Sequence, residues 1–414
     1  MTRPDADTPP LIVVGASVRA VAASAARAGW SVHAADLYAD ADLRATATTT
    51  TRVRVDSALP WPAGLESAIT GFPVAPWLYT GALENHPDLV DRLARVRPLA
   101  GNDGDRLRAV RDPARLAAAV RAAGLMFPDT FADPTGLPVD GAFLVKPRAS
   151  AGGRGVARWL GGCAPADRVW QRFVPGRPWS VAFAMHDGVA RTFAASRQLV
   201  GRRWCGTGGH AWCGAIDIAV ATLPSGLRAR LDRLGAALAD HFGLVGIVGV
   251  DLVRDASGGL HVIEVNPRPT ASLELAERAT GESVVATHLA ACGFAAPRAC
   301  GSPPPRRRRV WAKAVVFADR TTPFDVPLAG ALAALADRWA DDDGWPPLAD
   351  LAEPDTTIAA GGPALTVFAA ADTATAALRA VRGRVSGVRA ALRGAGVSPP
   401  ADGARRPPPP GSTA

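Results

Sequence analysis

The stretch Gly246-Ile-Val-Gly-Val-Asp-Leu-Val-Arg-Asp-Ala-Ser-Gly-Gly-Leu-His-Val-Ile-Glu-Val-Asn-Pro-Arg268 decides the fold. Two runs rich in Val and Ile flank Ala256-Ser-Gly-Gly259, which predicts a β-hairpin. A two-residue turn at Ser257-Gly258 would place Asp251 directly opposite Glu264. Since side chains alternate between the faces of a strand, Asn266 shares the face of Glu264. The hairpin therefore brings three oxygen ligands together.

Such hard oxygen ligands suit Mg²⁺ (or Mn²⁺), which prefers one or two carboxylates and adds phosphate oxygens. Arg268 follows the hairpin and carries a planar cation suited to a phosphate. The opposite face of the hairpin is predicted to be apolar and buried, and consists of Val250, Leu252, Ile263 and Val265. An apolar opposite face makes a purely solvated polar hairpin the weaker interpretation.

A phosphate site is predicted upstream, in Phe143-Leu-Val-Lys-Pro-Arg-Ala-Ser-Ala-Gly-Gly-Arg-Gly-Val156. The pattern is a short buried strand, a cation and a glycine loop whose N–H groups can approach an anion. Of the 46 basic residues only Lys146 and Lys313 are lysines. A chain that uses Arg almost everywhere thus keeps a compact ammonium beside the loop, where Lys and Arg are not equivalent. The alternative is a surface lysine before a turn.

Length and composition indicate a protein of several domains. At 414 residues the chain is too long for one core, and 48% apolar with 20% charged residues is typical of a globular protein. The net charge of +8 would allow nucleic-acid binding, but the Arg residues are dispersed apart from 306–309 and there are only two Tyr. We expect no nucleic-acid partner, and a basic pocket for ATP and an acidic substrate accounts for the same charge.

Five cysteines, an odd number without a CxxC pair, fit neither a zinc site nor a disulfide framework. Reduced thiols indicate a cytoplasmic protein. The first residues lack the features of a signal peptide. No run approaches the roughly 18 apolar residues that a membrane span needs, so we expect no membrane association.

The N-terminal region predicts a βαβ unit, with strands at 11–14 and 30–36 around an Ala-rich helix that ends at Gly29. The turn at Gly15 lacks two glycines of a GxGxxG fingerprint, which argues against a nicotinamide cofactor. Gly15, Ser17 and Arg19 could hold a small anion at the helix start, or the turn could be purely structural. Apolar segments at 72–79 and 89–96 continue this α/β region to about residue 100.

The middle of the chain alternates helices and strands. Asp112 as N-cap, Pro113 and Gly124 delimit a helix. The segment 169–183 predicts strand, turn and strand, and extended backbone at Gln171–Val174 could present N–H and C=O groups to a flat base edge. The glycine-rich segment 201–214 predicts a mobile loop, in which His210 more simply has no role than contacts a substrate. Helices are expected at 223–241, 271–280 and 284–292.

The C-terminal part predicts a small separate module. Residues 302–309 indicate a linker, and strands are expected at 310–318 and 364–370. Lys313 lies on the first of these strands and is expected to be exposed rather than catalytic. From about residue 397, Pro, Gly and Ala dominate and predict a disordered tail.

Taken in order, these features resemble the ATP-grasp superfamily of carboxylate–amine ligases. The resemblance covers roughly 11–292 and is best at Lys146–Val156 and at Val250-Asp251 and Ile263–Arg268. It implies an α/β (α+β) ATP-grasp fold. The expected parts are an N-terminal Rossmann-like βαβ domain (1–105), an ATP-grasp domain (106–300, with a lid at about 125–185), a C-terminal α/β module (301–396) and a tail (397–414).

The resemblance also implies a role for each matching residue. Lys146 would hold ATP phosphates, and Ser150, Gly152, Gly153 and Gly155 would belong to the lid loop over them. The backbone of Gln171, Arg172, Phe173 and Val174 would contact adenine, with Arg172 and Val174 reading it. Asp251, Glu264 and Asn266 would bind Mg²⁺, and Arg268 would stabilise the transferred phosphoryl group, so that Lys146 and Arg268 are the expected catalytic residues.

Two departures from the family pattern stand out. Arg111 occupies the place of an earlier lysine in many members, and Pro178 stands near the place of an acid that binds the ribose. The opening and the region of 288–292 look most like the branch with tyramine–glutamate ligase and the pyrrolysine-pathway lysine ligase.

The expected activity is ligation of a small carboxylate to an amine through an acyl phosphate, with release of ADP and phosphate, in a cytoplasmic and homodimeric enzyme. One alternative is a carboxylase or purine-pathway enzyme of the same fold that uses bicarbonate. The other is an ATP-binding protein without catalysis, which would not need a full set of metal ligands.

Overall fold

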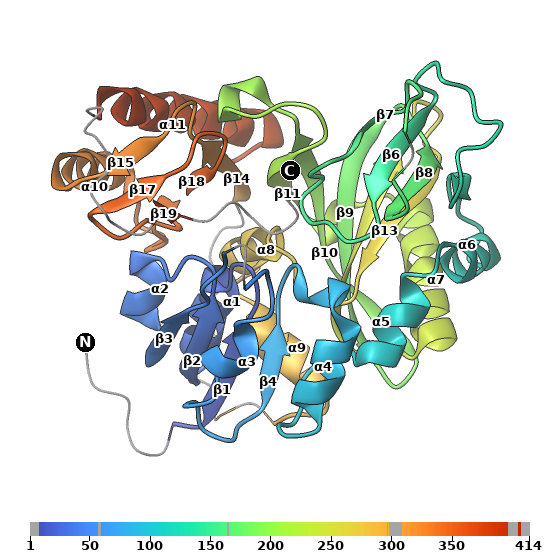
Figure 1. Ribbon diagram of the computed structural model, residues 1–414, viewed down its shortest axis with the longest axis horizontal. Helices are drawn as coiled ribbons and strands as arrows, with labels where there is room; N and C mark the ends of the chain where they lie inside the picture. Colours follow the sequence, from blue (N-terminus) through green and yellow to red (C-terminus); the bar gives the residue numbers. More distant parts are fainter. Residues whose placement is uncertain are drawn as a thin grey trace.

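The computed structural model describes residues 8–56, 59–163, 165–295, 297, 309–395 and 405–406. Figure 1 shows three regions, an N-terminal α/β layer, a large central sheet with a small sheet beside it, and a C-terminal layer of strands and helices. The predicted linker at 302–309 lies outside the described residues except for Arg309, and the predicted tail lies outside them except for β19 (Arg405–Arg406). The α/β (α+β) class is confirmed.

The N-terminal region is a parallel four-stranded sheet in the order β3-β2-β1-β4. Side chains of β1 enter two cores, with Ile12 and Val14 on one face and Leu11 and Val13 on the other, as expected of a parallel strand buried on both sides. The predicted βαβ unit is therefore present. The elements of the N-terminal region are β1 (Pro10–Val14), α1 (Arg19–Arg27), β2 (Ser31–Asp36), α2 (Ala41–Thr46), β3 (Thr49–Arg52), α3 (Leu65–Ala68), β4 (Trp77–Tyr79), η1 (Leu83–Asn85), α4 (Pro87–Ala94) and α5 (Gly104–Val110).

A small antiparallel sheet in the order β5-β8-β6-β7 lies in the segment where the lid is predicted, and its role as a lid stays a prediction. It follows a helix whose N-cap is confirmed, because the Asp112 side chain accepts hydrogen bonds from the backbone N–H groups of Ala114 and Arg115. A core of Phe143, Trp159 and Trp170 holds the sheet together. The elements are α6 (Pro113–Ala122), β5 (Thr130–Phe131), β6 (Phe143–Pro147), β7 (Ala157–Arg158) and β8 (Arg168–Arg172).

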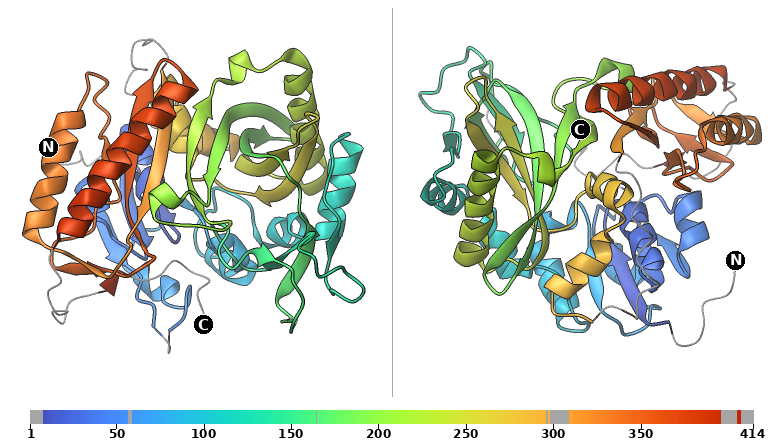
Figure 2. Two further views of the ribbon diagram at one scale, coloured as in Figure 1. Left: turned by 90° about the horizontal axis from the view of Figure 1, so that it is seen from above. Right: turned by 180° about the vertical axis from the view of Figure 1, so that it is seen from behind.

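The central sheet has eight strands in the order β13-β12-β9-β10-β11-β14-β18-β16. Its first strands present Val181, Phe183 and Val250 to α7, which lies along this face (Figure 2). Gly235 allows close packing there, since a Cβ on it would lie 2.8 Å from the Phe183 ring. The elements are β9 (Arg177–His186), β10 (Val189–Val200), η2 (Arg203–Cys205), β11 (Trp212–Ile218), η3 (Val220–Thr222), α7 (Ser225–Phe242), β12 (Gly246–Arg254), β13 (Leu260–Asn266), α8 (Leu273–Thr280) and α9 (Val284–Ala291).

The C-terminal strands continue this sheet, because β14 pairs with β11 at Gly214 and Ala314. A small second sheet has the order β15-β17-β19, and α11 packs on β14 and β18. The elements are β14 (Val310–Phe317), β15 (Thr322–Phe324), α10 (Val326–Trp339), β16 (Leu348–Ala349), β17 (Thr356–Ile358), β18 (Pro363–Ala371), α11 (Ala374–Gly394) and β19. The boundaries at residues 105, 300 and 396 stay predictions.

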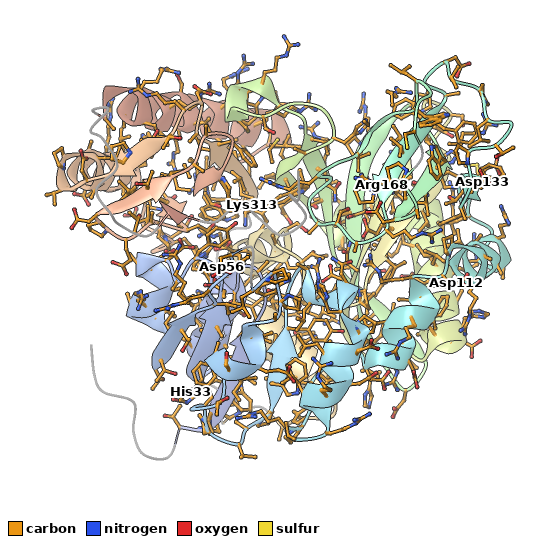
Figure 3. The ribbon with its side chains drawn as sticks, in the orientation of Figure 1. His33, Asp56, Asp112, Asp133, Arg168 and Lys313 are labelled. Carbon is orange, nitrogen blue, oxygen red and sulfur yellow. The ribbon has the colours of Figure 1, made fainter. Side chains whose placement is uncertain are left out.

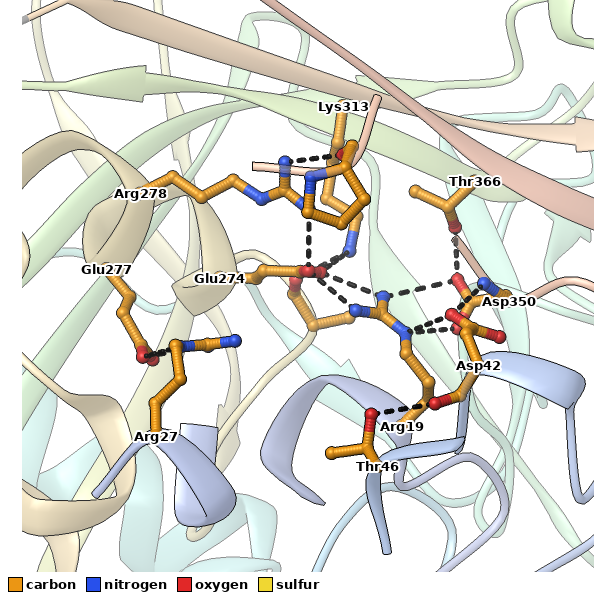
Figure 4. Close-up of polar contacts among 12 residues, drawn as sticks. Arg19, Arg27, Asp42, Thr46, Glu274, Glu277, Arg278, Lys313, Asp350 and Thr366 are labelled. Atoms are coloured by element: carbon orange, nitrogen blue, oxygen red, sulfur yellow. Dashed lines mark hydrogen bonds and ion pairs between the residues drawn. The ribbon is translucent and has the colours of Figure 1, made fainter. Parts of the chain in front are cut away.

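An ionic cluster joins all three regions (Figure 4). Arg19 at the start of α1 donates two hydrogen bonds to Glu274 of α8, at 2.6 and 3.0 Å, and two to Asp350, at 2.9 and 3.4 Å. Arg278 and Lys313 also contact the Glu274 carboxylate, at 3.1 and 3.2 Å. Burial alone would raise the pKa of Glu274, but the charges of Arg19, Lys313 and Arg278 hold it well below its usual value.

This cluster corrects two expectations. Lys313 is 2% exposed and lies in the interior of the molecule (Figure 3), because β14 is an inner strand of the large sheet rather than part of a separate surface. Arg19 is paired with carboxylates from two other regions, so it is not a free cation at the helix start.

Candidate active site

The predicted pairing of the two carboxylates is confirmed: Asp251 lies opposite Glu264 in the β12–β13 ladder, and Gly249 lies opposite Asn266. The predicted two-residue turn is wrong. The last pair before the turn is Arg254 with Leu260, and the register shifts between Asp251 and Leu252. The longer turn shifts the pairing of the two strands, and the β-bulge shifts it back. Asp251 therefore still lies opposite Glu264.

The bulge also corrects the predicted apolar face. Ile263 is the extra residue, so Val262 takes its expected place in the core, where it is fully buried with Leu252 and Val265. Ile263 instead lines the pocket described below, beside Glu264.

The electrostatics around Asp251 fit a divalent cation. Burial, and then the charge of Glu264, raise the pKa of Asp251 to about 6. The carboxylate accepts hydrogen bonds from Gln198 Nε2 at 2.6 Å and Asn266 Nδ2 at 3.3 Å. A cation would reduce the repulsion between these two partly buried carboxylates, and an amide oxygen from Asn266 would complete an all-oxygen set.

The described residues contain no group of three or more His, Cys, Asp or Glu side chains placed to hold a metal. A cation at this hairpin would therefore rely on two carboxylates, one amide and oxygens of a bound ligand. That composition suits Mg²⁺ with phosphates better than a structural metal held by protein alone.

A pocket of about 130 Å³ lies beside the hairpin and collects several predicted residues: Arg111, Lys146, Ser150, Gln171 and Glu264 line it. Lys146 Nζ donates to Gln171 Oε1 at 3.1 Å, and Gln171 Nε2 donates to Thr130 Oγ1 at 3.2 Å. Burial lowers the pKa of Lys146, an effect opposed by the charges of Glu264 and Asp251. The two cations and the carboxylate thus face one space.

Arg111, which occupies the place of an earlier lysine in many members of the family, lines the same pocket as Lys146. One terminal nitrogen, Nη2, donates to the Arg148 carbonyl at 2.9 Å. The other, Nη1, is buried and has no hydrogen-bond partner among the residues that the structure describes. An anion in the pocket could take up this donor.

The glycine loop is packed against the segment between β10 and β11. Gly152 accepts a hydrogen bond from the Trp212 N–H at 2.9 Å, and a Cβ on Gly153 would lie 2.1 Å from the His210 carbonyl oxygen. Gly152, Gly153 and Gly155 all have positive φ, at 65°, 74° and 69°, which favours glycine. The His210 ring in turn lies against Phe173, with the ring centroids 6.4 Å apart.

The four residues predicted to contact adenine differ in their hydrogen-bond partners. Gln171 directs its side chain to Lys146, and the N–H groups of Arg172 and Phe173 donate to the carbonyls of Asp129 and Ala142. In the described part of the chain the Val174 N–H has no acceptor, so it remains able to contact a base. Adenine contact by this segment stays a prediction.

Arg268 is held by hydrogen bonds to the hairpin and to the N-terminal region. Its Nη2 donates to Asn266 Oδ1 at 3.2 Å and to Glu84 Oε1 at 2.5 Å, and Nη1 donates to the Pro269 carbonyl. Burial would raise the pKa of Glu84, but the Arg268 and Arg111 cations lower it, so Glu84 is an ionised partner.

Glu84 and its neighbour Asn85 are the residues that the sequence analysis missed. They lie in η1, at the carboxyl end of β4, where ligands bind in open parallel sheets. The polar triplet Glu84-Asn85-His86, a few residues after the buried strand β4, was the available signal. Asn85 Nδ2 donates to the carbonyl of Ser150 at 3.5 Å, which links the N-terminal sheet to the glycine loop.

Comparison with known proteins agrees with this geometry. Residues 110–272 match the model of an ATP-grasp domain, so the chain contains such a domain, and its fold is the ATP-grasp fold. No curated protein sequence matches the chain significantly. Among the described residues, no helix is long and apolar enough to cross a membrane.

Several solved structures are similar in fold. An N5-carboxyaminoimidazole ribonucleotide synthetase in complex with ADP superposes with a TM-score of 0.62 at 15% identity, over 95% of this chain and 100% of that chain. The same synthetase from Thermus thermophilus gives 0.61 at 18% identity, over 91% and 97%. The biotin carboxylase of Campylobacter jejuni gives 0.63 at 14%, over 89% of each chain.

Proposed function

We propose that the chain, through its ATP-grasp domain, is an ATP-dependent carboxylate–amine ligase that forms an acyl phosphate and releases ADP and phosphate. The observation that carries the proposal is the pocket in which Lys146, Arg111 and Glu264 face one another. Cations at a phosphate chain, next to carboxylates that can hold a divalent ion, favour transfer of the terminal phosphoryl group.

The proposed chemistry runs in two steps. An oxygen of the acid attacks the γ-phosphorus of ATP, the new C–O–P linkage forms, and the bond to ADP breaks with its electron pair leaving on ADP. The amine nitrogen then attacks the acyl carbon, expels phosphate and loses a proton. Lys146 and Arg111 would hold phosphate oxygens, and Arg268 would hold the acyl-phosphate end.

A magnesium ion held by Asp251, Glu264 and Asn266 would supply charge neutralisation on the phosphates. The glycine loop would exclude water from the reactive acyl phosphate. The hydrogen bond from the Trp212 N–H and the close packing on the His210 carbonyl would hold the loop against the segment between β10 and β11.

The test is a screen for ADP release with amino acids and amines, followed by the mass of the product. The resemblance to tyramine–glutamate and lysine ligases makes L-glutamate with tyramine, and L-lysine with a second amino acid, the first pairs to try. With the acid but no amine, hydroxylamine should trap a hydroxamate. Formation of AMP and pyrophosphate would contradict the proposed phosphoryl transfer even if an amide appeared.

The metal assignment has its own test. Glu264→Gln should abolish metal-dependent ADP release, because only one carboxylate would remain, while the thermal midpoint without ligand stays within a few degrees, because the core face of β13 is unchanged. Glu282→Gln, at an exposed ion pair with Arg191, is the matched control. Near-normal turnover of Glu264→Gln would contradict the metal site.

A second candidate is a carboxylase that uses bicarbonate, and the similarity to biotin carboxylase and carboxyaminoimidazole synthetases favours it. Incorporation of labelled bicarbonate into a product, with ADP release that needs bicarbonate but no amine, would identify it. ATP binding without ADP release under any of these conditions would indicate a non-catalytic binder. We also propose that the protein is cytoplasmic and forms a homodimer; light scattering of the purified chain tests the dimer.

A further inference from the structure

Helix η1 carries two polar side-chain atoms that have no hydrogen-bond partner among the described residues. Glu84 is 1% exposed, yet only its Oε1 accepts a hydrogen bond, from Arg268; its Oε2 is buried with no partner among the described residues. The Oδ1 atom of Asn85 is buried and unpartnered in the same sense. Buried acceptors without donors cost about 1–3 kcal/mol each, so N–H donors of a bound group would be stabilising at these two adjacent residues.

The backbone holds these acceptors in a strained, fixed position. Ala82, which precedes η1, has a φ of 76°, a left-handed conformation that side-chain-bearing residues rarely adopt. The Gly81 carbonyl accepts a hydrogen bond from the Ala16 N–H at 3.0 Å, and a Cβ on Gly81 would lie 3.4 Å from Arg268 Nη2. Strain maintained by surrounding contacts is typical of a functional site.

The unpartnered atoms are of two kinds, hydrogen-bond acceptors and hydrogen-bond donors. Glu84 and Asn85 offer acceptors, whereas Arg268 Nε and Arg111 Nη1 offer buried donors without partners among the described residues. The donors would take oxygens of a phosphate or carboxylate. The acceptors require N–H groups, and the carboxylate of Glu84 favours a positively charged donor.

We propose that Glu84 and Asn85 bind a primary ammonium group of a substrate, next to Arg268, the cation assigned above to the acyl-phosphate end. The inference rests on the proposed function and names the chemical class that the site selects: a substrate whose amino group carries at least two N–H donors. The ammonium belongs either to the acid that is activated, which is then an amino acid, or to the attacking amine.

The first experiment measures binding without activity. Saturation transfer from the full-length protein to the methyl protons of methylammonium chloride is compared with that to tetramethylammonium chloride, which has the same charge but no N–H donor. Transfer should occur to methylammonium and be at least tenfold weaker to tetramethylammonium. Glu84→Gln should reduce the methylammonium signal to that background.

Two further variants keep the test decisive. Asn85→Ala removes the second acceptor without touching Arg268 and should weaken methylammonium binding at least threefold. Glu66→Gln removes an exposed carboxylate paired with Arg92 and should bind like the unmodified protein. Equal transfer to both cations, or unchanged methylammonium binding in both Glu84→Gln and Asn85→Ala, would overturn the proposal.

The second experiment finds the source of the ammonium. If Glu84 binds the amino group of the acid, Glu84→Gln raises the KM for the acid at least tenfold in the hydroxamate assay. If it binds the attacking amine, the variant leaves that assay unchanged and raises the KM for the amine. Because methylammonium binding needs no ATP, absence of ADP release would contradict the proposed function and leave this inference standing.

Discussion

At the scale of single residues, the site depends on which cation occupies each position. Lys146 is held by Gln171 on one side and faces the carboxylate of Glu264 across the pocket. Its ammonium is compact and can approach a phosphate oxygen as a point charge, whereas a guanidinium is a wide planar group. The other lysine, Lys313, has a structural position against Glu274.

We therefore expect Lys146→Arg to lower kcat/KM for ATP at least tenfold, or about 1.4 kcal/mol of transition-state stabilisation, because the longer fork would displace Gln171 and crowd the phosphates. Steady-state ADP release measures it. Arg92→Lys, an exposed substitution at the ion pair with Glu66, should leave the rate unchanged. Equal activity of Lys146→Arg would mean that Lys146 does not contact the transferred phosphate.

At the scale of elements, the glycine loop and helix α9 each connect parts of the molecule that are distant in the chain. The loop meets the segment between β10 and β11 through Gly153, whose missing side chain permits contact with the His210 carbonyl. Helix α9 carries His288, which is 1% exposed and bridges two regions: its Nδ1 accepts from the Ile247 N–H at 2.9 Å and its Nε2 contacts the Ala100 carbonyl at 3.0 Å.

Two neighbouring glycines allow a matched comparison. Gly152→Ala and Gly153→Ala both place a side chain at positive φ, at a cost of about 1 kcal/mol each. Only at Gly153 does the new Cβ meet backbone, since nothing lies within 4 Å of a Cβ on Gly152. We expect Gly153→Ala to weaken ATP binding about tenfold more than Gly152→Ala, as measured by equilibrium titration. Equal effects would show that contact with His210 does not position the loop.

His288 makes stability depend on pH. Burial lowers its pKa to about 4, although its hydrogen bond to Ala100 acts in the opposite direction. The unfolded chain takes up a proton near pH 6.5 and the folded chain does not, so stability is full above pH 6.5 and falls as the pH decreases toward 4.

Between pH 7 and pH 5 this residue should account for about 2 kcal/mol of lost unfolding free energy. Urea unfolding at the two pH values measures the loss. In His288→Gln, which cannot be protonated, the difference between pH 7 and pH 5 should be smaller by that amount, even though the variant is less stable at both. An unchanged difference would contradict the low pKa.

At the scale of the whole molecule, three regions meet at Glu274 (Figure 4). The carboxylate contacts Arg19 from the N-terminal sheet, Arg278 from its own helix and Lys313 from the C-terminal strands. Its burial makes the balance of charge essential, because without it Arg278 and Lys313 would keep no carboxylate partner among the described residues, whereas Arg19 would keep Asp350.

Glu274→Gln should therefore lower the free energy of unfolding by about 3 kcal/mol or more, which urea unfolding at neutral pH measures. Glu282→Gln, nearby in sequence but at an exposed ion pair, should change it by less than about 1 kcal/mol. A small loss in Glu274→Gln would mean that water or neighbouring groups compensate the three cations. The same change should leave the pocket around Lys146 intact.

Elements whose signals lie between neighbours along the chain could be predicted from the amino-acid sequence. Alternating apolar residues and turn residues predicted the β12–β13 hairpin, and Asp112 with Pro113 predicted the start of α6, because these structures are specified by neighbours along the chain. The family resemblance, carried by residue types and their order, implied the ATP-grasp fold, and it implied phosphate and metal roles for Lys146 and Glu264, which line one pocket in the structure.

Features that depend on partners distant in the chain became visible in the folded molecule. The bulge that exchanged Ile263 for Val262 in the core, the burial of Lys313 within a continuous sheet, and the pairing of Arg19 with Glu274 all follow from packing between regions. Glu84 gained its place beside Arg268 across 184 residues of chain. No local pattern encodes such contacts, because a charged residue carries the same sequence signal whether water or a buried partner will satisfy it.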